Sequence, residues 1–169
     1  MQSSRFLKAQ QGFTLLELMV TLTIAGILAA IAVPTMQSIT INRHADRLAN
    51  ELQLDIMYAR NHALSLNKNV TIKPLPGGWD TGWVVAQGTD VIRQKGSASA
   101  PMAKKTGEIT STFTTAAPLI FDRNGRVNNP SNSTNAGSFS INVADCTGDR
   151  KRTLQLNYIG QLQTINSPC

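Results

Sequence analysis

The chain has 169 residues, and its 16 basic and 10 acidic side chains give it a formal net charge of +6 at pH 7. This length allows one membrane-spanning helix and one small domain. The sequence contains no H-E-x-x-H, Walker, C-x-x-C or G-x-S-x-G string, and its two histidines, His44 and His62, lie far apart along the chain. We therefore expect no enzymatic activity, no cofactor, and no catalytic or metal-binding residues.

An apolar run of about 21 residues, from Phe13 to Val33, contains a single charged side chain, Glu17. A carboxylate in hydrocarbon costs about 2.5–3.5 kcal/mol on insertion scales, so a specific partner is expected for it. The short polar segment before the run carries Arg5 and Lys8. Cations on this side predict a cytoplasmic N-terminus and a C-terminal body on the other side of the membrane.

The string Gly12-Phe13-Thr14-Leu15-Leu16-Glu17 resembles the processing and methylation motif of type IV pilins and type II secretion pseudopilins. The resemblance implies that a prepilin peptidase removes residues 1–12 by cutting after Gly12, and that the new amino group of Phe13 is methylated. Residues 13–34 would then form a transmembrane and assembly helix. Glu17 would pair with the amino group of Phe13, on a neighbouring subunit or its own. A missing partner would leave a buried charge unpaired, so such a pair would enforce register.

An ordinary secretory signal peptide is the alternative interpretation of the same segment. It is favoured by the basic leader and by Ala30-Ile31-Ala32, which resembles a signal-peptidase site. Glu17 within the apolar run argues against it, as does the complete pilin-like string.

Residues 35–169 are expected to form an outer domain. An apolar stripe with spacings of three and four predicts a helix over residues 35–67, with a weak joint at Pro34, and packing against a sheet. Residues 70–169 alternate between short strand-like segments and turns, with polar loops expected at 97–115 and 128–137. The predicted fold class is α+β, a type IV pilin-like fold with a long N-terminal helix packed on a small antiparallel sheet domain. The strands are expected at 70–72, 83–86, 90–93, 119–121, 138–143, 153–157 and 160–163.

Three strings in this domain extend the resemblance to the FimT/GspH-type minor pilins and pseudopilins. They lie at residues 59–63, 78–83 and 121–126, with the sequences ARNHA, GWDTGW and FDRNGR. Trp79 and Trp83, in the second string, are interpreted as packing aromatics, with base stacking as the alternative.

The two cysteines, Cys146 and Cys169, both lie in the part expected outside the cytoplasm, where disulfides persist. A bond between them would close a loop of about 24 residues and would stabilise the fold by roughly 3.5 kcal/mol in the chain-entropy model. Free thiols are the alternative.

Positive charge is concentrated late in the chain, where residues 93–169 hold nine basic and four acidic side chains. The densest segment, Gly148-Asp149-Arg150-Lys151-Arg152, resembles the Gly-Arg-x-Arg motif with which some FimT-type minor pilins bind DNA during natural transformation, but it has an additional acidic residue. Arginine forks and lysine ammonium groups both suit phosphate. The expected DNA-binding residues are Arg150, Lys151 and Arg152, helped by Arg123, Arg126, Lys104 and Lys105.

The sequence thus favours a minor type IV pilin that binds extracellular duplex DNA without sequence preference and supports DNA uptake. The alternative is a structural minor pseudopilin of a type II secretion pseudopilus or a pilus-initiation complex, with no DNA binding. The expected partners are other pilins, the prepilin peptidase and duplex DNA. The protein is expected in the bacterial inner membrane, crossing it once with its C-terminal domain in the periplasm, and outside the cell once in a pilus.

Overall fold

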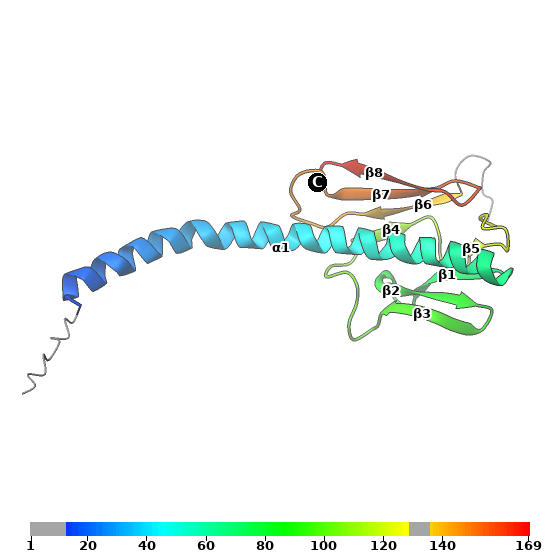
Figure 1. The fold of residues 1–169 in the computed structure, drawn as a ribbon, viewed down its shortest axis with the longest axis horizontal. Helices are drawn as coiled ribbons and strands as arrows, with labels where there is room; N and C mark the ends of the chain where they lie inside the picture. The colour runs from blue at the N-terminus through cyan, green and yellow to red at the C-terminus, as the bar shows by residue number, and fades with distance from the viewer. Residues whose placement is uncertain (1–12, 129–135) are drawn as a thin grey trace, which may run out of the picture. The chain divides into compact units, whose positions relative to one another are not determined.

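The computed structural model describes residues 13–128 and 136–169. It divides into two compact units, one ending at Gln37 and one running from Ser38 to Cys169. The helix α1, Leu15–Leu66, belongs to both units, and eight strands follow it among the described residues of the second (Figure 1). The prediction of a long helix followed by an antiparallel β-rich domain is confirmed. The helix assignment is continuous through Pro34, which the sequence predicted to be a weak joint.

The second half of α1 supplies the centre of the core. Leu48, Leu52 and Ile56 are almost fully buried on the predicted stripe. Alanines on the same face allow the strands to approach the helix closely, because a methyl group occupies little space between backbone layers. These alanines are Ala45, Ala49, Ala59 and Ala63.

Two four-stranded antiparallel sheets lie on either side of this part of α1 in the view of Figure 1. The first, sheet A, has the order β3-β2-β1-β5, with β1 at Val70–Leu75, β2 at Gly78–Gln87, β3 at Asp90–Gly96 and β5 at Leu119–Phe121. The second, sheet B, has the order β4-β6-β7-β8, with β4 at Ile109–Ser111, β6 at Gly137–Ile141, β7 at Lys151–Leu156 and β8 at Leu162–Ser167.

The structure differs from the sequence prediction at β4, which lies inside the segment expected to be a loop. Asp80 in β2 explains this strand, because its carboxylate accepts hydrogen bonds from the backbone N–H groups of Gly107, at 2.6 Å, and Ile109, at 2.8 Å. A three-residue strand held by a carboxylate from the other sheet has too weak a sequence pattern to be recognised. The loop expected at 128–137 lies largely outside the described residues.

Both tryptophans are buried, which supports the packing interpretation over base stacking. The indole N–H of Trp79 donates to the carbonyl of Phe113 at 2.8 Å, and that of Trp83 donates to the Asp55 carboxylate at 2.8 Å. Asp55 is itself buried in the helix and also accepts from Arg93 at 2.8 Å. This network ties α1 to β2 and β3 and pairs both carboxylate oxygens of the buried Asp55, as buried polar groups require.

Candidate assembly helix and basic surface

The N-terminal part of α1 exposes its apolar side chains around the helix. Phe13 is 84% exposed, and the large apolar residues from Leu15 to Ile31 are 48–77% exposed. The helix passes the length and hydropathy criteria for crossing a membrane. Hydroxyl groups in this run are satisfied internally, since Thr21 donates to the carbonyl of Leu18 at 2.9 Å and Thr23 donates to that of Val20 at 2.8 Å. A surface of this kind fits hydrocarbon or other apolar helices.

Glu17 lies in the first turn of α1, next to the expected new N-terminus at Phe13. Its backbone N–H donates to the hydroxyl of Thr14 at 3.2 Å, so Thr14 caps the helix. The spacing of Thr14 and Glu17 is that of a capping box, a local role for the carboxylate that the sequence analysis did not consider. The predicted cleavage residue Gly12 lies outside the described residues.

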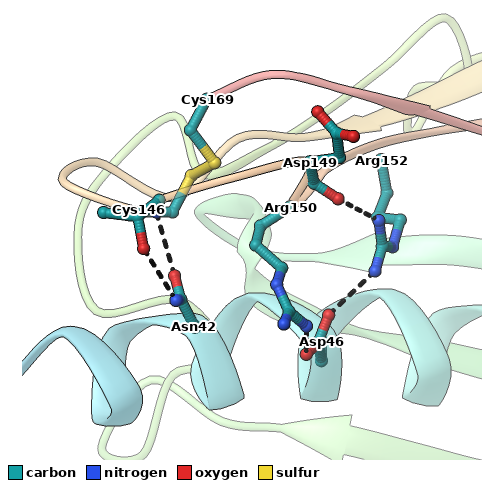
Figure 2. Close-up of polar contacts among 8 residues, drawn as sticks. Asn42, Asp46, Cys146, Asp149, Arg150, Arg152 and Cys169 are labelled. Carbon is teal, nitrogen blue, oxygen red and sulfur yellow. Dashed lines mark hydrogen bonds and ion pairs between the residues drawn. A yellow bond between two sulfur atoms is a disulfide. The ribbon is translucent and has the colours of Figure 1, made fainter.

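In the C-terminal basic segment, two of the three cations contact the helix (Figure 2). Arg150 and Arg152 each bond a different carboxylate oxygen of Asp46, and the contact from Arg152 measures 2.9 Å. Arg152 also donates to the carbonyl of Asp149 at 2.6 Å, and only 18% of its side chain is exposed. The guanidinium groups of these two predicted DNA-binding residues are therefore held in ion pairs with α1.

The disulfide between Cys146 and Cys169 is confirmed and lies beside the same contact (Figure 2). The backbone N–H of Cys169 donates to the carbonyl of Gly148 at 3.1 Å. Thr147, which follows Cys146 in the chain, forms two hydrogen bonds with Asn42 on α1. The Asn42 side chain accepts from the backbone N–H of Thr147 at 3.0 Å and donates to its hydroxyl at 2.9 Å. We call the set Asn42, Asp46, Thr147, Arg150 and Arg152 the helix clamp, since it fixes the disulfide loop to α1.

The remaining predicted DNA-binding residues are spread over the domain. Lys151 and Arg152 are neighbours in β7, and successive side chains of a strand point to opposite faces of the sheet. Since Arg152 contacts α1, the side chain of Lys151 lies on the face of sheet B that points away from α1. Lys104 is exposed, and Lys105 is exposed and pairs with Asp145 at 3.3 Å.

Arg123 and Arg126 flank a tight turn at the other end of the domain. The Asp122 carboxylate accepts from the backbone N–H groups of Asn124 and Arg126, which explains the FDRNGR string as a turn. The guanidinium of Arg60, from the ARNHA string, donates to the carbonyl of Gly125 in this turn at 3.0 Å. On α1, Asp46 contacts the clamp arginines and Arg60 contacts this turn. The two residues are 14 positions apart, which is about 21 Å along a helix. The seven predicted residues therefore do not form one continuous patch.

A buried pair near the clamp also escaped the sequence analysis. The imidazole of His44 lies 2.9 Å from the Glu108 carboxylate, and both side chains are almost fully buried. Glu108 also accepts from the backbone N–H of Lys104 at 2.9 Å. The sequence contained only a weak indication that His44 is buried, namely that it precedes Ala45, a residue of the apolar stripe. Among the described residues, no group of three or more His, Cys, Asp or Glu side chains is arranged to hold a metal ion.

A family profile described as type II transport protein GspH matches residues 48–160, about two thirds of the chain. The chain belongs to the GspH family of type IV pilin-like proteins. The profile of the prokaryotic N-terminal methylation motif matches residues 7–33 of this GspH-family protein, so the motif recognised at Gly12–Glu17 is confirmed as that motif.

Individual relatives match mainly over a short segment. A fimbrial protein of Pseudomonas aeruginosa is 50% identical over 46 residues, which are 27% of this chain and 30% of the relative. The type IV major alpha-pilin of Moraxella bovis is 48% identical over 46 residues, 27% of this chain and 29% of the relative. The matched segments thus span less than a third of these curated relatives.

Two crystal structures of the Pseudomonas aeruginosa type IV minor pilin FimU are also similar to this GspH-family protein. The first is 24% identical with a TM-score of 0.49, covering 73% of this chain and 89% of FimU. The second is 27% identical with a TM-score of 0.47, covering 71% of this chain and 91% of FimU.

Proposed function

We propose that this protein is a minor filament subunit of a type IV pilus or a type II secretion pseudopilus, anchored in the inner membrane before assembly. The observation that carries the proposal is the N-terminal helix, whose apolar side chains are unburied within the described chain. Such a surface requires lipid before assembly and other subunits afterwards. The partners are then the other pilins of the filament and the prepilin peptidase that cuts after Gly12. The outer domain is expected on the periplasmic side.

Glu17 is the residue at which this proposal is most easily tested, because two roles compete for its side chain. As a charge, it would pair with the amino group of Phe13 in the assembled filament. As part of a capping box, it would stabilise the first turn of α1 beside Thr14. Glutamine can serve at the same capping position but carries no charge, so it separates the two roles.

The experiment compares Glu17→Gln, Glu17→Ala and a control, Glu51→Ala, in sheared filaments from cells that express the full chain. We expect both Glu17 variants to be processed and inserted but to be incorporated at least tenfold less than the control. Normal incorporation of both variants would refute the charge-pairing role. Loss in Glu17→Ala with normal incorporation of Glu17→Gln would assign the residue to helix capping.

DNA binding is the second candidate function, and free positive charge supports it. Among the described residues, Lys104, Arg123, Arg126 and Lys151 form no ion pair, and Arg150 keeps 40% of its side chain exposed despite its contact with Asp46. Binding would be sequence-independent, through phosphates, and would weaken steeply with salt. It would support DNA uptake in natural transformation.

The helix clamp changes how this candidate is tested. Substituting Arg150 and Arg152 would leave Asp46 unpaired and would confound folding with binding. Asp46→Asn instead removes the negative charge that pairs with both guanidinium groups, while Asp90→Asn makes the same charge change at an exposed site in β3. If the clamp arginines contact phosphates, Asp46→Asn should bind duplex DNA several-fold more tightly than Asp90→Asn at low salt. The salt slope should also increase by about one for each added contact. Equal affinities for the two variants would exclude the arginines from DNA binding.

A further inference from the structure

The strand β8 is an edge of sheet B, with no further strand beside it among the described residues. It is the last strand in the order β4-β6-β7-β8, and four of its six residues are exposed. Its sequence, LQTINS, contains no charged residue and no proline. Edge strands usually carry such residues to prevent pairing with other chains. An unprotected edge of this length is therefore a surface that can accept another strand.

The register with β7 shows which backbone groups of β8 are available. The N–H of Asn157 donates to the carbonyl of Gln161 at 3.0 Å, and the pairing continues without a shift to Lys151 and Ser167. Hydrogen-bonded and non-bonded pairs alternate along an antiparallel ladder. Gln163 and Ile165 therefore direct their backbone groups toward β7. Leu162, Thr164 and Asn166 direct theirs outward, as a row of donors and acceptors that have no backbone partner among the described residues.

A groove of about 540 Å³ lies between this hairpin and α1. Its helix wall includes Gln53, Met57 and Asn61, and its other wall includes Asn157 and Gln161 from the β7–β8 turn. Among the described residues, no acidic side chain and only one basic side chain, Arg60, line it. Arg60 already donates to two backbone carbonyls, those of Gly125 and Ile159.

The chemistry of this groove favours a neutral peptide over a polyanion. Carboxamides match the donor and acceptor pattern of a peptide group, and the groove offers no free charge to a phosphate. Asn61 makes no side-chain hydrogen bond within the described chain, and Gln53 uses only its oxygen, which accepts from Thr164 at 3.3 Å.

We propose that β8 and this groove bind an extended, uncharged peptide segment of a neighbouring filament subunit as an added strand. The proposal rests on the assembly function proposed above. The outward groups of Leu162, Thr164 and Asn166 would form the main-chain ladder of the added strand. Every second side chain of the added strand would enter the groove and meet the carboxamides of Gln53 and Asn61.

Amide hydrogen exchange on the full chain tests the proposal, by comparing detergent-solubilised protein with sheared filaments at single-residue resolution. In detergent, the amides of Gln163 and Ile165 should be protected, whereas those of Leu162, Thr164 and Asn166 should exchange quickly. In filaments, we expect protection of the second set to rise at least tenfold. Unchanged fast exchange in filaments that contain the protein would overturn the proposal and leave the assembly function intact. Absence of the wild-type protein from filaments would instead refute the assembly function, and this proposal with it.

A pair of substitutions provides a second readout. Thr164→Pro removes an outward N–H and places a ring on the free edge, while the bonds to β7 remain. Thr164→Val loses the same hydroxyl contact with Gln53 but keeps the backbone donor. We expect Thr164→Pro to be incorporated several-fold less than Thr164→Val. Equal incorporation of the two folded variants would overturn the proposal, as would protection of β8 that persists in Thr164→Pro. If Thr164→Pro does not fold, the exchange experiment on the wild-type chain decides whether β8 pairs with an added strand in filaments.

Discussion

The two units of this chain differ in where their apolar side chains find partners. In residues 38–169, large side chains such as Trp83, Leu52 and Phe139 are almost fully buried by the domain itself. In the N-terminal unit, Leu22 and Ile27 are more than 60% exposed, and the hydroxyls of Thr21 and Thr23 bond only to their own helix. The domain is specified by contacts within the chain. Within the described residues, the N-terminal part of α1 leaves its apolar side chains uncovered, and we propose that lipid or other subunits cover them.

The largest expected effect comes from removing a core side chain of the domain. Leu52→Ala should lower the free energy of unfolding of the outer domain by about 2–5 kcal/mol, because it deletes buried methyl groups and leaves a cavity. Leu22→Ala is the matched control, since its side chain is 63% exposed. Denaturant unfolding of the full chain in detergent should show no comparable loss for the control. A similar loss in both variants would contradict the division between the two units.

Removing the disulfide should cause the next largest loss of stability. Cys146→Ser opens the loop between Cys146 and Cys169 and should destabilise the domain by about 2–5 kcal/mol through greater freedom of the unfolded chain. Urea unfolding with and without a reductant measures it. The wild-type protein should lose the same stability on reduction, whereas Cys146→Ser should be insensitive to the reductant. A wild-type midpoint that does not respond to reduction would show that the bond contributes little.

These stabilising features differ in how far the sequence alone could predict them. The stripe through Leu48, Leu52 and Ile56 was predictable because helical periodicity is local. The disulfide was predictable because the two cysteines lie in the part of the chain expected outside the cytoplasm. The helix clamp was not predictable, because it joins Asp46 to arginines 104 and 106 positions later. In the sequence, a run of cations indicates phosphate binding. Only the fold shows that the carboxylate of Asp46 lies against two of these cations.

Breaking the clamp should cost less than losing the disulfide. Asp46→Ala removes a carboxylate that is 29% exposed and bonds two arginines, so we expect a loss of about 1–2 kcal/mol. Lys105→Ala is the control, because its ion pair with Asp145 is largely exposed and should contribute less than about 1 kcal/mol. Thermal unfolding of both variants with the disulfide intact makes the comparison. A smaller effect for Asp46→Ala than for Lys105→Ala would show that the clamp does not fix the loop.

The smallest expected effect comes from an exposed leucine of the same helix and shows how strongly the loss of stability depends on burial. Leu54 belongs to the folded domain but is 62% exposed on α1. Leu54→Ala should change the free energy of unfolding by less than about 0.5 kcal/mol, although the same atoms are removed as in Leu52→Ala. Denaturant unfolding of this pair of variants measures the difference. A loss above 1 kcal/mol would mean that Leu54 has partners in the free protein.

Thiol accessibility at Leu22 shows directly whether neighbouring subunits cover the N-terminal helix in the filament. Both native cysteines of the full chain are in the disulfide, so Leu22→Cys carries a single free thiol, with Lys73→Cys as the exposed control in β1. A water-soluble maleimide is applied to sheared, membrane-free filaments. We expect that Lys73→Cys is labelled and that Leu22→Cys, although present in the filaments, is labelled at least tenfold more slowly. Equal labelling of the two thiols in filaments would contradict this expectation.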